Sequence, residues 1–312
     1  MELIFLGTGG AWGLPEHRCP CATCRHLRAI GESRTRTSLW LDGPARVLID
    51  PGPDLRAQMV REDLPRPDAV LVTHEHGDHY LGLDELLCFR RNLPPDSWRP
   101  IPVYATAQAW EQIEPRFGYL LGSLLEKRLA EPGRELTGAP FGPELAALPV
   151  KTFHGAMAKG SVGYVLTLAT AGGPYRLGYT SDMVRVEEPQ GFAGLDLLVC
   201  QSHFVHEPAV NRANHLSLQN ALPLIAAWRP GRVFLAHISC QDFIPGDDEA
   251  NAMLKKYAPG DPLKDPDGKP YPVPQDQGQW QALVERVFAG HGLAMPVRAA
   301  HDGLRVALPE AA

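Results

Sequence analysis

One short stretch of this chain gathers three histidines and an aspartate within a few residues of one another. His74, His76, Asp78 and His79 follow the apolar run Ala69–Val72, which is typical of a buried strand. Imidazole and carboxylate groups are the ligands that zinc, manganese and iron prefer, and four such groups are costly to bury without partners. The pattern therefore predicts a divalent metal site on the turn at the end of that strand.

This pattern, His-x-His-x-Asp-His after a strand, resembles the signature of the metallo-β-lactamase superfamily, and the resemblance extends from Met1 to about Leu308. It implies an α/β fold of the αββα sandwich type, in which two mixed sheets are flanked by helices. It also implies two metal ions with further ligands at the ends of later strands. The implied ligands are His74, His76 and His154 for one ion, Asp78, His79 and His237 for the other, and Asp182 as a bridge between them.

A pair of ions in such a site predicts hydrolytic chemistry. Two divalent metals ~3.5–4 Å apart can share a bridging hydroxide and hold an ester oxygen. Two dications, two carboxylates and one hydroxide sum to a charge of about +1, which favours a small anionic substrate. We therefore expect two zinc or manganese ions and a phosphodiesterase that acts on a small phosphodiester, cyclic ones included. The ligands alone leave a lactone or thioester hydrolase open as an alternative.

Some residues near the predicted site admit more than one interpretation. Asp50, before Pro51, could hold a liganding histidine through its outer ring nitrogen, or it could simply form a turn. His203 and His206 follow an apolar strand and could line the pocket, but neither receives a role here. The resemblance implies that Glu75 points away from the metals.

Three cysteines near the N-terminus form a second group of ligands. Cys19 and Cys21 are too close together for a comfortable disulfide. The first residues resemble a strand and not a secretion signal, so we expect a cytoplasmic chain with reduced thiols. With Cys24, three reduced thiols indicate a fourth ligand and a structural zinc. Cys240, three residues after His237, is the candidate, and the alternative is a loop of thiols without metal.

The cysteine spacing, the Gly7–Ala11 stretch and the His237-Ile-Ser segment resemble one branch of the superfamily. That branch contains the phosphoribosyl cyclic phosphodiesterase of bacterial phosphonate breakdown and the B-type proteins of quinone-cofactor biosynthesis. Resemblance to the phosphodiesterases implies that His215 contacts the phosphate and protonates the leaving oxygen, so His215 and Asp78 are the predicted catalytic residues. The alternative for this segment is that Asn214 or Ser217 merely starts a helix. A quinone-biosynthesis type of small-molecule binding stays open as a second function.

The composition of the chain limits the classes of binding partner that the sequence predicts. The 312 residues are 44% hydrophobic, and they are consistent with one hydrolase domain over the whole chain. A net charge of −6 argues against a broad nucleic-acid surface, and no apolar run reaches the roughly 18 residues of a membrane helix. A basic cluster between Arg25 and Arg36 could be a solvated loop or a rim that attracts an anionic substrate.

The remaining sequence supplies the elements that must position these groups. Alternating apolar patterns predict strands at about 2–6, 38–41, 46–50, 69–73, 163–169, 175–179 and 195–200, with a last one at 297–308. Helical spacing is expected at 81–91, 218–228 and 280–289. It is also expected at 107–130, whose apolar face could pack on the sheet or on a second copy in a homodimer. Repeated prolines make about 255–279 an extended insertion that forms neither a helix nor a central strand.

Overall fold

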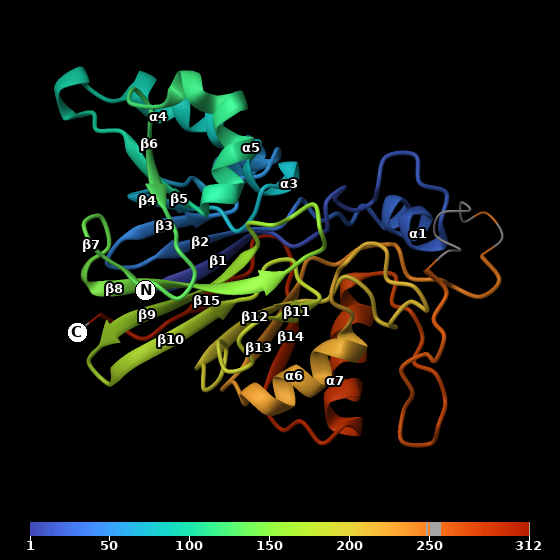
Figure 1. The fold of residues 1–312 in the computed structure, drawn as a ribbon. Coiled ribbons are helices and arrows are strands. Elements are labelled where there is room, and N and C mark those ends of the chain that lie inside the picture. Colours follow the sequence, from blue (N-terminus) through green and yellow to red (C-terminus); the bar gives the residue numbers. More distant parts are fainter. Residues whose placement is uncertain (248, 250–256, 312) are drawn as a thin grey trace.

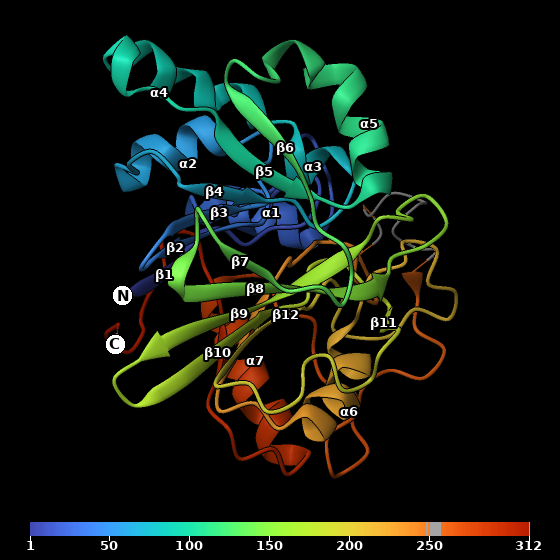
Figure 2. The ribbon, with the colours of Figure 1, turned by 60° about the vertical axis from the view of Figure 1, so that its left-hand side comes forward.

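The computed structural model describes residues 1–247, 249 and 257–311, and two β-sheets packed face to face form its centre (Figures 1 and 2). In spatial order the first sheet contains β15 (Arg305–Ala307), β1 (Glu2–Gly7), β2 (Ser38–Asp42), β3 (Arg46–Ile49), β4 (Ala69–Leu71), β5 (Ile101–Ala105) and β6 (Leu125–Leu129). The second contains β11 (Arg185–Val186), β8 (Gly142–Phe153), β9 (Val162–Thr170), β10 (Gly173–Tyr179), β12 (Leu197–Gln201), β13 (Val233–Ala236) and β14 (Val297–Ala299), with β7 (Leu136–Gly138) beside β8. Each sheet has parallel and antiparallel neighbours, so both are mixed.

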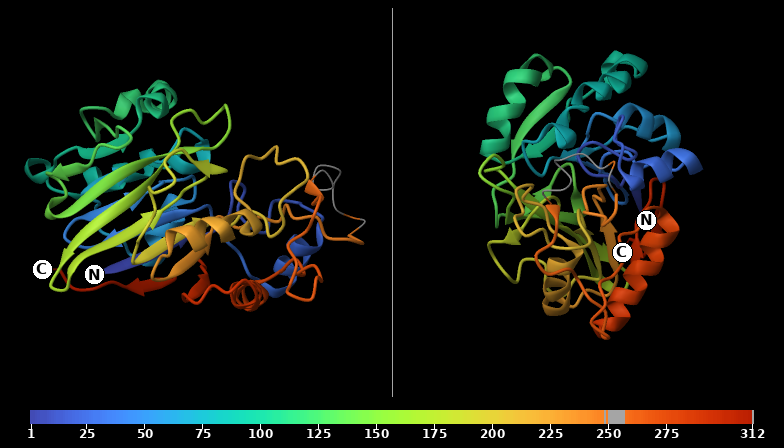
Figure 3. Two further views of the ribbon diagram at one scale, coloured as in Figure 1. Left: turned by 60° about the horizontal axis from the view of Figure 1, so that its bottom comes forward. Right: turned by 90° about the vertical axis from the view of Figure 1, so that its right-hand side faces the viewer.

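Helices cover the outer face of each sheet and complete four layers (Figures 2 and 3). On the first sheet lie α2 (Leu55–Glu62), α3 (Gly77–Tyr80), α4 (Leu87–Asn92) and α5 (Ala107–Phe117), with the 3₁₀ turns η1 (Leu83–Leu86), η2 (Pro95–Ser97) and η3 (Gly118–Leu120). On the second lie α6 (Leu218–Trp228) and α7 (Gln277–Gly290), and α1 (Ala22–Ile30) lies beyond one end of the sheets (Figure 1). The predicted αββα sandwich with two mixed sheets is confirmed.

Strand β13 shows why these strands appear as continuous apolar runs. Val233 and Leu235 pack in the core shared with α6 and α7, whereas Phe234 and Ala236 pack in the core between the two sheets. Successive side chains of a strand point to opposite faces, and here both faces are covered. The sequence therefore shows no alternation of polar and apolar residues at a central strand of this kind.

The strands that precede the predicted ligands all run in one direction. β3 and β4 are parallel neighbours in the first sheet, and β10, β12 and β13 are parallel in the second. β8 shares the direction of β10, because each is antiparallel to β9. Their carboxyl ends meet at one edge of the sandwich, where binding sites of α/β proteins form.

Both ends of the chain lie at the opposite edge of the sandwich (Figure 1). Glu2 pairs with Ala307 at the start of β1, and the Leu308 amide donates to the Met1 carbonyl at 2.8 Å. Among the described residues, none of the helices combines the length and the apolar character that crossing a membrane requires.

Two expected elements differ in the structure. The predicted helix at 107–130 ends at Phe117 and η3, and Leu125–Leu129 instead forms strand β6 beside β5. The predicted last strand at 297–308 is two strands, β14 and β15, which belong to different sheets. The turn between them contains Asp302, whose carboxylate accepts hydrogen bonds from Thr8 and Thr35. Residues 257–276 of the Pro-rich insertion contain neither a helix nor a named strand, and 255–256 lie outside the described residues.

Candidate functional site

The structure brings the predicted active-site ligands together at the carboxyl-end edge. The histidine-rich motif occupies the loop after β4 and the start of α3, while His154 and His237 directly follow β8 and β13. Asp182 lies three residues after β10. Within each group the ligand atoms lie within 4.8 Å of one another; one group is His74, His76 and His154, and another is Asp78, His79, Asp182 and His237.

Asp182 lies at the centre of these groups. Its Oδ2 atom is 3.1 Å from His237 Nε2 and 3.4 Å from His79 Nε2. The same oxygen is 3.8 Å from His154 Nε2 in the other group, and that nitrogen is 3.2 Å from His76 Nδ1. One carboxylate therefore lies against both groups, which is the position that a bridging ligand requires.

Asp50 supports the motif from the end of β3. Its Oδ2 accepts a hydrogen bond from His79 Nδ1 at 2.8 Å and others from the hydroxyls of Thr73 and Tyr179 at 2.9 and 3.2 Å. It also adopts the left-handed φ of 56° at the turn before Pro51, so both interpretations of Asp50 hold. A Cβ on Gly52 would lie 2.1 Å from the Asp78 carbonyl oxygen, so glycine is required where this turn approaches the motif.

Two further histidines are fixed through their outer ring nitrogens. His74 Nδ1 lies 3.1 Å from the Thr73 hydroxyl, which itself donates to Asp50. His154 Nδ1 donates to the Asn214 carbonyl at 2.7 Å, and Asn214 has a left-handed φ of 56°, which asparagine adopts more readily than most residues. In each ring the hydrogen bond that Nδ1 donates leaves Nε2 with a lone pair toward the cluster.

Opposite charges reinforce one another in the second group. Burial lowers the pKa of His79, but the carboxylates of Asp78, Asp50 and Asp182 together raise it well above its usual range. Burial also opposes protonation of His237, yet Asp182 raises its pKa to about 9. Burial would raise the pKa of Asp182, but His237 and His79 lower it well below its usual range. The group therefore has a strong affinity for positive charge.

The donor set fits divalent cations. The Nε2 atoms of His74, His79 and His237 are buried, and each lacks a hydrogen-bond partner among the described residues. A buried polar atom without a partner is costly unless a ligand or ion satisfies it. Once deprotonated, these three nitrogens beside the carboxylates of Asp78 and Asp182 are the donors that zinc and manganese take.

His215 lies beside these groups, together with a glutamine that the sequence reasoning missed. Gln201, the last residue of β12, donates through Nε2 to His215 Nδ1 at 2.7 Å and to Asp182 Oδ1 at 3.0 Å. Ser217, not Asn214, caps helix α6 by accepting from the Asn220 amide. Gln201 directly follows an apolar strand, as His154 and His237 do, so position at a strand end could have identified it.

The structure also separates the two histidines that had no assigned role. His203 belongs to a group with His215 and His237, and its ring stacks on that of His215 with centroids 3.9 Å apart. His206 faces away from this group, and its Nδ1 accepts from the Leu263 amide in the Pro-rich insertion. Glu75 accepts from the Gly160 amide at 3.1 Å, as expected for a side chain turned away from the ligands.

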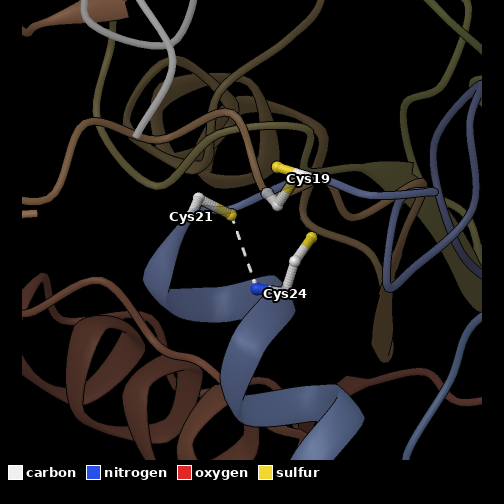
Figure 4. Close-up of side chains that lie close together, drawn as sticks. Cys19, Cys21 and Cys24 are labelled. Atoms are coloured by element: carbon white, nitrogen blue, oxygen red, sulfur yellow. Dashed lines mark hydrogen bonds between the residues drawn. The ribbon is translucent and has the colours of Figure 1, made fainter. Parts of the chain in front are cut away.

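The four predicted cysteine ligands form a separate buried group. Figure 4 shows Cys19, Cys21 and Cys24 side by side where the N-terminal loop enters α1, and the Cys24 amide donates to Cys21 Sγ at 3.4 Å. Cys240 joins them from the segment after β13. The neighbouring Cys24 and Cys240 thiols lower the pKa of Cys21, whereas the Cys19 and Cys21 sulfurs raise that of Cys240. Four sulfurs that stabilise thiolate within the group are an arrangement that zinc can complete.

The basic residues around the cysteines are paired internally. Arg28 donates to the Cys19 carbonyl at 2.6 Å, and Arg25 forms ion pairs with Asp247 and Glu249. Arg34 is buried and donates to Thr8, and Arg36 pairs with Asp54 at 3.0 Å. These contacts hold the N-terminal loop and contradict the interpretation of this cluster as a free electrostatic rim.

A cavity opens beside the first ligand group. It has a volume of about 480 Å³ and is lined by His76 and Glu75 of the motif and by residues of α5 and the 156–159 loop. Arg116 and Lys159 supply positive charge on its wall and Glu75 and Glu111 supply negative charge, while Tyr80 and Met157 supply apolar surface. A cavity of this size and mixed character suits a small molecule.

Comparisons by sequence place these residues in a known family. The model described as "Beta-lactamase superfamily domain" matches residues 45–238, a range that contains every predicted histidine and aspartate ligand. An octanoyltransferase from Porphyromonas gingivalis is 40% identical over 124 residues, which are 38% of this chain and 23% of that protein. The chain spans less than half of the length of the curated relatives that it matches first.

Two solved structures resemble nearly the whole chain. A diphosphatase from the PhnP family is 22% identical and has a TM-score of 0.68, covering 98% of this chain and 97% of that chain. Zinc-bound PqqB from Methylobacterium extorquens is 21% identical with a TM-score of 0.67, covering 99% and 100% of the two chains. At these identities the likeness establishes the shared fold.

Proposed function

The chain belongs to the beta-lactamase superfamily, and we propose that it is a metal-dependent hydrolase of small phosphodiesters. The observation that carries this proposal is the position of Asp182, whose carboxylate lies against both ligand groups. Two divalent ions would be held by His74, His76 and His154 on one side and by Asp78, His79 and His237 on the other. We further propose that a structural zinc occupies the four-cysteine group.

Bound at these residues, a pair of divalent ions supplies an electrophile for the phosphoryl group and an activated water. The chain supplies the rest of the site. The cavity beside His76 would receive one substituent of the diester, and both charges on its wall, Arg116 and Lys159 as well as Glu75 and Glu111, could contact its polar groups. A volume of about 480 Å³ favours a nucleotide or sugar phosphate over a polymer.

His215 would act on the substrate's oxygens. Gln201 donates to its Nδ1, so the hydrogen of a neutral ring is on Nε2, available to a phosphoryl or leaving oxygen. Burial, together with His203, lowers the pKa of His215 well below its usual range. The ring is therefore neutral in the free protein, and an anionic phosphodiester nearby would favour the protonated form that an acid needs.

One observation favours a second candidate function. The likeness to zinc-bound PqqB is about as extensive as that to the diphosphatase. On this alternative the same edge binds a quinone-like small molecule without hydrolysing a phosphodiester. The octanoyltransferase resemblance covers 23% of that protein, and octanoyl transfer is not part of the proposal.

Hydrolysis of bis-p-nitrophenyl phosphate, with manganese or zinc added to chelator-treated protein, tests the proposal. We expect metal-dependent release of p-nitrophenol, and slower or no cleavage of a p-nitrophenyl ester and a thioester of similar size. Preferential cleavage of the carboxylic ester or thioester would support the lactone or thioester alternative. Metal binding without any hydrolysis would overturn the hydrolase proposal and favour the binding function.

The His215→Ala variant tests the acid role. We expect a rate loss of about 10²–10⁴-fold on a diester with an alkoxide leaving group and a much smaller loss on the p-nitrophenyl diester, whose leaving group needs no proton. Metal content should not change, because His215 lies outside both proposed ligand sets. Equal losses on the two substrates would contradict proton donation by His215.

A further inference from the structure

The histidines of the proposed metal site differ in what holds their outer nitrogens. His74, His79 and His154 are each held by an oxygen, from Thr73, Asp50 and the Asn214 backbone. His237 instead has another imidazole beside it, because its Nδ1 lies 3.3 Å from Nδ1 of His203. An imidazole nitrogen can either donate or accept. This contact therefore orients His237 as a ligand only if the hydrogens of both rings have fixed positions.

Gln201 fixes them. Its Oε1 accepts from the Met183 and Leu216 amides at 2.9 and 3.0 Å. These two donors identify which end of the side-chain amide is the oxygen and which is the nitrogen. Its Nε2 has two hydrogens and three neighbours, at 2.7 Å in His215, 3.0 Å in Asp182 and 3.2 Å in His237. The two closer acceptors take both hydrogens, so His237 Nδ1 is free to carry its own hydrogen and donate it.

Within the cluster of Gln201, His203 and His237, this hydrogen has one possible acceptor, which is His203 Nδ1. The opposite nitrogen, His203 Nε2, lies 3.1 Å from Gln241 Oε1 and donates to it. A single chain of donors thus runs from His237 through His203 to Gln241. It leaves Nε2 of His237 directed at Asp182 and Asp78.

Packing confines the two rings. A Cβ on Gly10 would lie 3.2 Å from His203 Cε1 and 3.6 Å from His237 Cε1, so the backbone passes near both imidazoles where residue 10 is a glycine. The Gly10 amide is tied to the Ile238 carbonyl at 2.8 Å. On the other side, His203 stacks on His215 at an interplanar angle of 11°.

From these contacts we propose that His203, held by Gln241, is the positioning residue for His237 and so sets the metal affinity of the Asp78–His79–Asp182–His237 group. It takes the place that an oxygen takes beside His74, His79 and His154. This inference rests on the proposed metal-dependent function, because it concerns a ligand of the same site. The acceptor role of Nδ1 requires the hydrogen of His203 to lie on Nε2, where Gln241 accepts it.

Two substitutions separate the hydrogen bond from the stacking. His203→Phe keeps a ring against His215 but removes the acceptor for His237. His203→Asn removes the ring but places an oxygen near the position of Nδ1. His206→Phe is the matched control, since His206 is buried three residues away and bonds to Leu263 instead.

The measurement is zinc stoichiometry and affinity, by competition with a chromophoric chelator on the full chain. Loss of such an outer partner typically weakens metal binding by about 10–100-fold. We expect that loss for one zinc in His203→Phe, near-parental affinity in His203→Asn and in His206→Phe, and a loss of a few-fold in Gln241→Leu. Gln241→Leu keeps the test available if His203→Phe does not fold.

The opposite order, with parental affinity in His203→Phe and weak binding in His203→Asn, would overturn the positioning role and assign His203 to packing. Parental affinity in all four variants would overturn it as well, while leaving the proposed function intact. A parent chain that binds no zinc beyond one per chain would overturn the metal-site assignment, and with it this inference.

Discussion

The four-cysteine group and the histidine and aspartate group are only three residues apart along the chain, at Cys240 and His237, yet they differ in how open they are. The cysteine group is closed, because all four sulfurs are on buried residues and face one another. The histidine and aspartate group is open on one side, where His76 lines a cavity. The first has no position left for water or substrate, whereas the second combines lone pairs with access. Access of water and substrate to the metal, more than the number of ligands, distinguishes a structural metal site from a catalytic one.

The largest effect is expected from Asp182→Asn. Asp182 lies against both ligand groups, so loss of its charge should remove at least one active-site ion. Because loss of a single preorganised group costs about 10²–10³-fold in rate, a shared ligand should cost about 10³-fold or more. Steady-state kinetics and metal analysis measure this. Asp196→Asn is the control, since Asp196 only accepts from the Arg176 amide, and comparable losses in both variants would contradict the central role.

Cys240→Ser should affect stability first and hydrolysis second. We expect the structural zinc to be lost and the Tm to fall by roughly 5–10 °C, as a loss of about 2–3 kcal/mol would produce in a large domain. Activity per folded molecule should fall only through displacement of His237, three residues away. Calorimetry and zinc analysis measure the change, with Cys88→Ser on the surface as the control. A variant that loses hydrolysis but keeps its Tm would break the distinction between the two groups.

The smallest expected effect is the pH dependence of metal affinity at the histidine and aspartate group. Carboxylates raise the pKa of His79 well above its usual range and that of His237 to about 9 in the metal-free protein. At pH 7–8 both rings hold protons that an incoming ion must displace, so metal affinity should rise with pH up to about 9. Titration calorimetry in two buffers of different ionisation enthalpy would count the protons released. Affinity that is constant between pH 6.5 and 9 would contradict this.

The part of the site that is local in sequence could be predicted from residue types alone. His74, His76, Asp78 and His79 stand together after an apolar run, and their ligand chemistry is evident without a fold. His154, Asp182 and His237 were placed only through the family resemblance, because their proximity depends on which strands lie side by side. The metal-binding roles of all these residues stay predictions.

The missed features share a physical cause, which is that distant contacts decided them. Leu121, Leu124 and Leu125 fit a helical face, but pairing of β6 with β5 places Leu125 in a strand. His203 and His206 have similar local sequence, and only packing against Gly10 and Gln241 on one side, or Leu263 on the other, separates them. Gln201 gave no signal by residue type, since glutamine is rarely considered among catalytic ligands.

The two described ends of the chain lie next to each other. Met1 and Leu308 are hydrogen-bonded neighbours, and they lie at the edge of the sandwich away from both ligand groups (Figure 1). A tag, a surface attachment or a second domain joined at either end would leave the cavity beside His76 unobstructed. Immobilised or fused forms of the protein are therefore suitable for the metal and hydrolysis measurements described above.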